Sequence, residues 1–112
     1  MNIGEKMIDT EKFLDLVENH HIKGTLHNKE CTNFCLVGAT YVAADLFDFE
    51  KGDLKEDATG IIIKNKLYKS LEKAVKEFHG EYIEIATFND SPQYKHEDIV
   101  AVAKKAVADL EL

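Results

Sequence analysis

Apolar residues recur at helical spacing in three stretches of the chain, and a fourth stretch is apolar almost throughout. The periodic stretches cover residues 9–24, 64–79 and 96–110, and each predicts an amphipathic helix. The continuous stretch is too long for a typical strand, so it predicts a buried helix over residues 34–47. Valine and threonine residues within it keep a strand as the alternative.

One further segment, residues 81–88, alternates between two faces and predicts a short strand. Because a lone strand cannot satisfy its own backbone, it needs a partner, and both 61–63 and 22–26 are candidates. Residues 89–92 follow as a turn. The chain is therefore expected to be mostly α (α+β), a single compact domain over residues 1–112 with about four helices and one short β element.

Length and charge narrow the classes of function. The 112 residues are 45% hydrophobic, which is typical of a folded domain, and no apolar run reaches the roughly 18–20 residues of a membrane helix. The N-terminal segment lacks the apolar stretch of a signal peptide, so a cytoplasmic location is expected. Fourteen Lys and Arg against 21 Asp and Glu give a net charge of −7. Direct binding to nucleic acid or to an anionic membrane is therefore not expected.

The strongest local charge lies between residues 45 and 57, where six carboxylates face two lysines. Their spacing lacks the ligand order of a calcium loop. We expect a solvated acidic loop that docks on a basic protein surface, with aromatic and aliphatic side chains as anchors. The residues expected to form this docking surface are Phe47, Asp48, Phe49, Glu50, Asp53, Leu54 and Asp57.

Two short motifs stand within the predicted elements: C-x-x-G-A at residues 35–39 and F-N-D-S-P at residues 88–92. They resemble a family of small bacterial and phage proteins of unknown function, in which a C-x-x-G-A segment precedes a W-N-D-x-P-G-R-T turn and a helix. The resemblance covers residues 10–110. The chain departs from the family pattern at Phe88, which replaces tryptophan, and at residues 93–95, which replace glycine, arginine and threonine.

The resemblance implies that Cys35, Asn89 and Asp90 share one site, and it points to a phage or another mobile element as the origin. A ligand contact made by the family's arginine would be lost in this chain.

A cysteine nucleophile is one chemical interpretation of these residues. Cys35 lies near the start of the predicted helix, where the dipole and free N–H groups stabilise a thiolate. His79 as base and Asn89 or Asp90 as the orienting group would complete a Cys–His–Asn/Asp arrangement. The apolar neighbours of Cys35 favour a small buried core side chain instead. A small enzyme or ligand-binding protein that uses these residues is the alternative function.

A metal site is a further alternative. His27, Cys31 and Cys35 follow each other at intervals of four residues and are ligand types that zinc accepts. Zinc-binding pairs are usually spaced more tightly, and a capping signal separates the two cysteines. A zinc-stabilised module is therefore the third hypothesis, whereas the preferred interpretation needs no cofactor. The other histidines, His20, His21 and His96, are interpreted as surface or helix-end residues.

Small size, acidic charge and the lack of a recognised catalytic motif favour a non-enzymatic module that binds a protein with a basic surface. For a protein of phage type, such a module is expected to be an inhibitor or sequestering protein that acts on a host or defence component.

Overall fold

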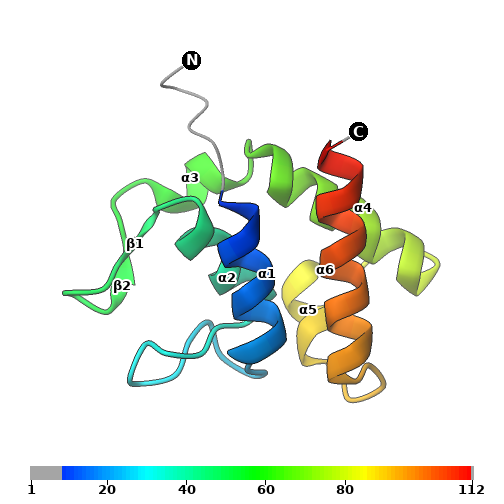
Figure 1. Ribbon diagram of the computed structural model, residues 1–112, viewed down its shortest axis with the longest axis horizontal. Coiled ribbons are helices and arrows are strands. Elements are labelled where there is room, and N and C mark those ends of the chain that lie inside the picture. Colours follow the sequence, from blue (N-terminus) through cyan, green and yellow to red (C-terminus); the bar gives the residue numbers. More distant parts are fainter. Residues whose placement is uncertain (1–8, 112) are drawn as a thin grey trace.

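Six helices and one short β-hairpin make up the described part of the chain, residues 9–111 of the computed structural model (Figure 1). The helices are α1 (Thr10–Asn19), α2 (Leu36–Ala43), α3 (Ala58–Ile62), α4 (Lys66–His79), α5 (Ile85–Asp90) and α6 (His96–Glu111), and the strands are β1 (Phe47–Asp48) and β2 (Asp53–Leu54). The radius of gyration is 13.1 Å, close to the roughly 13 Å expected for a compact domain of about 100 residues. The prediction of a compact, mostly helical domain is confirmed, whereas the predicted number of about four helices was too low.

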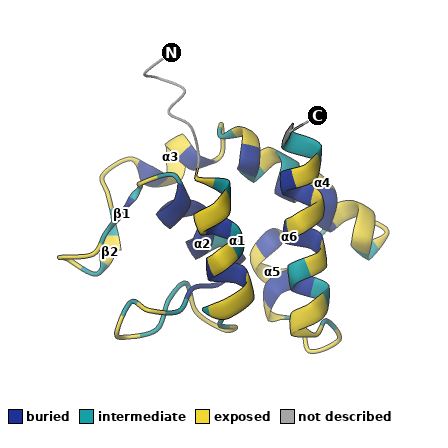
Figure 2. Ribbon diagram, in the orientation of Figure 1, coloured by how far each residue is buried: buried dark blue, intermediate teal, exposed yellow. Residues whose placement is uncertain are grey.

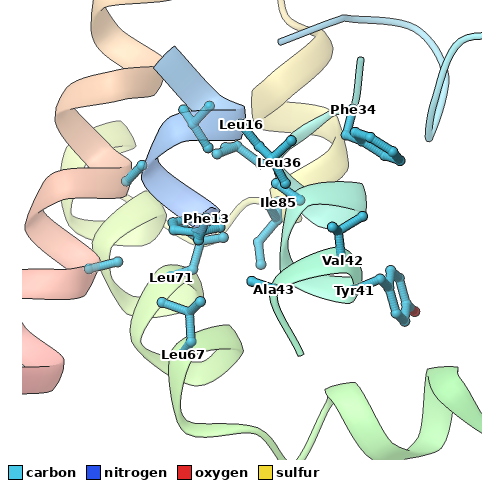
Figure 3. Packing of buried hydrophobic residues seen from close by; sticks show 14 of the residues in the cluster. Phe13, Leu16, Phe34, Leu36, Tyr41, Val42, Ala43, Leu67, Leu71 and Ile85 are labelled. Atoms are coloured by element: carbon cyan, nitrogen blue, oxygen red, sulfur yellow. The ribbon is translucent and has the colours of Figure 1, made fainter. Parts of the chain in front are cut away.

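The largest helix–helix contact joins α4 to α6, and α1 packs against both α6 and α2. Side chains from these helices form one buried cluster. Figure 2 colours the buried parts of the ribbon dark blue, and each of these helices contains some of them. Phe13 of α1 and Leu67 and Leu71 of α4 belong to this cluster, and all three are completely buried (Figure 3). Leu36 of α2 and Ile85 of α5 extend the cluster. Burial of apolar surface therefore joins helices from both ends of the described chain. None of the helices within residues 9–111 is long and apolar enough to span a membrane.

The amphipathic helices α1 and α4 follow capping signals that are visible in the sequence. Asp9 caps α1, because its Oδ1 accepts a hydrogen bond from Lys12 N at 3.0 Å. Asn65 caps α4 in the same way, through Leu67 N at 2.8 Å. The α4 helix ends at Gly80, whose φ of 99° lies in the left-handed region that favours glycine.

The helix predicted over residues 34–47 is shorter in the structure, where α2 takes up only its middle part. Phe34 has an extended backbone: its N donates to His20 O at 2.8 Å, and its O accepts from Ile22 N at 3.2 Å. This pairing also ends α1 at Asn19, before the predicted end of that helix. Apolar residues at both ends of the run are buried without being helical, and periodicity alone cannot distinguish that case.

The strand predicted over residues 81–88 was wrong, because the second half of this segment belongs to α5. Its alternation of polar and apolar residues coincides with a helical pattern at positions i, i+3 and i+4. The buried residues of this helix are Ile85, Phe88 and Asn89. Neither expected partner, 61–63 or 22–26, pairs with it as a strand. Asn89 and Asp90, expected in a turn, form the last turn of α5.

The β structure lies instead in the acidic segment, where β1 and β2 form an antiparallel hairpin that extends away from the helices (Figure 1). Phe47 pairs with Leu54 and Asp48 with Asp53. We call residues 45–57 the acidic hairpin. Its turn is closed by Asp48, whose Oδ1 accepts hydrogen bonds from Glu50 N at 3.0 Å and Lys51 N at 3.2 Å.

Candidate functional site

Asn89 is a buried polar residue whose side chain forms four hydrogen bonds. Its side chain is completely buried and bonds to two other segments and to the adjacent Asp90. The Oδ1 atom accepts from Leu36 N at 3.1 Å and from His21 Nε2 at 2.5 Å. The Nδ2 atom donates to Ile22 O at 3.2 Å and to Asp90 Oδ1 at 2.9 Å. Two acceptor positions and two donor hydrogens are the full capacity of an amide, so no bonding capacity of Asn89 remains for a ligand.

The hydrogen bonds of Asn89 also determine the tautomer of His21. Leu36 N can only donate and Ile22 O can only accept, so the orientation of the amide is fixed. Because Oδ1 therefore faces the imidazole, His21 Nε2 carries the proton and donates it. Burial lowers the pKa of His21, and the nearby His96 and Lys23 lower it further, against the opposing effects of Asn89 and Asp90.

Asp90 holds the segment of residues 20–26 against α5. Its Oδ1 accepts from Gly24 N at 2.8 Å. On the same segment, Lys23 Nζ donates to Ser91 O at 2.8 Å and to Tyr94 O at 2.5 Å. The segment is thus fixed by polar contacts to residues that lie more than sixty positions later in the chain.

Cys35 caps α2, and its Sγ accepts a hydrogen bond from Gly38 N at 3.4 Å. Its side chain is only 5% exposed, and burial raises the pKa of the thiol, with the carboxylate of Asp90 acting in the same direction. The expected stabilisation of a thiolate by the helix N-terminus is therefore outweighed by desolvation. A protonated thiol at neutral pH is a cap and a core group, and a poor nucleophile.

The structure nevertheless brings the implied residues together. Cys35 and Asp90 line one open groove of about 260 Å³, and Asn89 bonds to the residue next to Cys35 in the chain. The other residues that line the groove are Gly24, Thr25, Leu26, Val37 and Ala86.

His79 is not part of this arrangement. It lies at the end of α4, where its Nδ1 is 2.6 Å from Tyr94 Oη and the two rings pack edge to face. The Cys–His–Asn/Asp arrangement predicted for a cysteine nucleophile is therefore not formed with this base. His21, interpreted from the sequence as a surface or helix-end residue, bonds to Asn89 instead. No local signal could have shown this, because the contact joins residues 68 positions apart.

The three predicted metal ligands make other contacts instead of forming a metal site. His27 Nδ1 is 2.6 Å from Asn28 O, a carbonyl that can only accept, so this nitrogen carries a proton and is no ligand as it stands. Cys31 Sγ lies 3.7 Å from the same nitrogen, whereas Cys35 caps α2. Within residues 9–111 no group of three or more His, Cys, Asp or Glu side chains is placed to hold a metal ion.

The acidic hairpin has a buried and an exposed aromatic residue. Phe47 is 3% exposed and packs edge to face on Phe34, with ring centroids 5.5 Å apart, so this predicted anchor belongs to the core. Phe49 is 54% exposed and packs against Phe47 at 4.9 Å. Leu54 is half-buried. The predicted docking surface therefore retains Phe49 as its exposed large apolar side chain.

Comparisons with known proteins give one relationship. No curated protein and no solved structure matches the chain. A family model matches residues 10–109, almost the whole chain, and its description is a family of unknown function (DUF6197). The resemblance to an uncharacterised family is thus confirmed. The chain belongs to this family of unknown function, DUF6197.

Proposed function

We propose that this chain is a non-enzymatic protein-binding module that recognises a basic partner through the acidic hairpin. The observation that carries the proposal is the state of Phe49: its side chain is 54% exposed, yet its ring packs on Phe47 and Phe34. An exposed aromatic group that is already held by buried neighbours loses little conformational freedom on binding. Such groups are the usual anchors of protein interfaces.

The charges around Phe49 support a basic partner. Six carboxylates and two lysines give the acidic hairpin a net charge of −4. Asp45 forms an ion pair with Lys55 at 3.2 Å, and Asp48 closes the turn. Glu50 and Asp57 are exposed. A single-sign field of this kind accelerates the approach of a positively charged surface.

The partner that fits is a protein with Lys or Arg residues around an apolar pocket that can receive a phenylalanine ring. The function expected for such a module is inhibition or sequestration of that partner. A phage or mobile-element origin, with a host or defence component as target, extends the proposal on the basis of the family resemblance.

The enzymatic alternative has less support. Cys35 is buried with a raised pKa, Asn89 has no free bonding capacity, and His79 packs against Tyr94. The zinc alternative has less support as well, since within residues 9–111 no group of three or more His, Cys, Asp or Glu side chains is placed to hold a metal ion.

The proposal is tested by photo-crosslinking from a single position of the chain. A photo-crosslinking amino acid, p-benzoylphenylalanine, replaces Phe49 in one preparation and Tyr82 in another. Tyr82 is 69% exposed and lies outside the acidic hairpin, so it is the matched control. Both preparations are exposed to the same cell lysate. We expect a basic protein to be crosslinked from position 49 and not from position 82.

The purified partner then allows a kinetic measurement. Phe49→Ser is expected to weaken binding at least about tenfold, mainly through faster dissociation, because it removes the anchor. Glu50→Gln with Asp57→Asn is expected to slow association and to reduce its salt dependence. Tyr82→Ser is expected to bind like the wild type. Unchanged affinity of the Phe49→Ser protein, with its fold verified by circular dichroism, would exclude the proposal.

A further inference from the structure

We propose that His21 and His96 form an acid-sensitive contact, which holds the segment of residues 20–26 on the helical core at neutral pH and loosens it when His21 is protonated. The two ring centroids are 5.6 Å apart, and the rings are tilted by 42°. The contact joins the segment of residues 20–26 to His96, the first residue of α6. This inference is independent of the proposed protein-binding function.

The hydrogen bond made by His21 leaves its other ring nitrogen for the incoming proton. His21 Nε2 donates to Asn89 Oδ1. His96 Nε2 is 3.0 Å from Glu18 O, a carbonyl that can only accept, so this nitrogen also carries a proton. Acid therefore protonates Nδ1 of His21. The positive charge then forms beside the ring of His96, without first breaking either hydrogen bond.

The surroundings offer little to compensate a charge on His21. Lys23, on the same segment, is positive. On α6, which begins at His96, the carboxylates of the first turn are Glu97 and Asp98. From α5, the carboxylate of Asp90 faces His21, but it is exposed and already accepts from Gly24 N.

The direction of the pH effect follows from the environment of His21. Burial, His96 and Lys23 hold its pKa below the ordinary value of 6.5 in the closed state. The open state has the ordinary pKa, so it takes up the proton first as the pH falls. The contact therefore gives its full stabilisation above about pH 6.5 and loses it progressively between that pH and the lower pKa of the closed state.

Loosening of this segment would open the groove beside Cys35. Residues 20–26 take part in two of the hydrogen bonds to α5, from Asn89 Nδ2 to Ile22 O and from Gly24 N to Asp90 Oδ1. Gly24 and Leu26 also form one wall of the groove. A segment that leaves the core as a unit breaks these bonds together and exposes Cys35, which is 5% exposed in the closed state.

Native-state amide hydrogen exchange measured by NMR between about pH 7.5 and pH 5 tests the inference. After correction for intrinsic exchange, the opening constants of Ile22 and Gly24 are expected to rise about tenfold per pH unit below about 6.5. The amide of Val75, in the buried face of α4, should not follow them. Long-range nitrogen spectra of the imidazoles should show the Nε2–H tautomer of His21 at neutral pH, with titration below 6.5.

Variants of the two histidines test whether the pH dependence of exchange comes from their contact. His96→Gln removes the neighbouring charge at an exposed position and should weaken the pH dependence of Gly24 exchange. His20→Gln, beside His21 in the chain, is the matched control and should leave it unchanged. His21→Gln should abolish the dependence; if this variant does not fold, the His96→Gln result and the wild-type titration decide. An equal rise for Val75, or an unchanged dependence in His96→Gln, would overturn the inference.

Discussion

At the scale of single residues, the buried amide of Asn89 connects segments that lie far apart in the sequence. Asn89 on α5 bonds to the start of α2 and to the segment around His21. The sequence singled out this residue through its N-D-x-P motif, but as a turn residue or a ligand contact. Its four hydrogen bonds give it a structural role, because buried polar groups that are fully paired specify one arrangement of the segments around them.

Replacement of Asn89 by alanine is expected to lower the free energy of unfolding by about 3 kcal/mol or more. The substitution leaves Leu36 N and Ile22 O without their partner, and each unsatisfied buried group costs about 1–3 kcal/mol. Urea unfolding followed by circular dichroism measures the loss. Asn19→Ala is the matched control: this exposed amide bonds only to Asp15, at 2.8 Å, and its loss should change stability by less than about 0.5 kcal/mol. A loss below about 1 kcal/mol for Asn89→Ala would contradict the structural role.

At the scale of elements, the long amphipathic helices could be predicted and the short elements could not. The apolar stripe of α4, its N-cap Asn65 and its C-cap Gly80 are all recognisable from the local sequence. The α5 helix has six residues, too few for its period to be distinguished from alternation. The acidic hairpin depends on Phe47 packing against Phe34, and no local pattern records that contact.

A close approach between α2 and the segment before it gives a prediction at this scale. A Cβ atom on Gly38 would lie 2.4 Å from Leu26 O, a backbone atom that cannot move aside alone. Gly38→Ala is therefore expected to destabilise the fold by about 1–3 kcal/mol, as overpacking does. Gly60 of α3 has nothing within 4 Å of the same position, so Gly60→Ala should be neutral or stabilising by up to about 1 kcal/mol. Equal urea midpoints for the two variants would show that the backbone around Leu26 shifts at little energetic cost.

At the scale of the whole molecule, sequence reasoning could reach the class of fold and the neighbourhood of the candidate site, but not its chemistry. The placement of Cys35 beside Asp90 follows the family resemblance. The thiol is nevertheless buried, and His79 lies against Tyr94. Burial and partner choice are properties of the packed chain, set by contacts between residues far apart in sequence, and a motif of five residues contains neither.

Net charge gives the last prediction, because salt should act in opposite directions on folding and on binding. The chain carries −7 at pH 7, and surface ion pairs such as that of Lys104 with Glu18 are weak. Repulsion within the molecule should outweigh these pairs. Raising sodium chloride from about 0.05 to about 0.5 M shortens the Debye length severalfold, so the free energy of unfolding at about pH 7.5 should rise by up to about 1 kcal/mol.

The same increase in salt should slow association of the acidic hairpin with its basic partner. Near pH 5.2, the isoelectric point of the sequence, the net charge vanishes and the effect of salt on unfolding should disappear with it. This comparison separates screening of charge from any general effect of salt on apolar surface, which would persist at both pH values. A fall in stability with salt at about pH 7.5 would mean that attractive pairs, and not repulsion among the excess carboxylates, dominate the electrostatics of the fold.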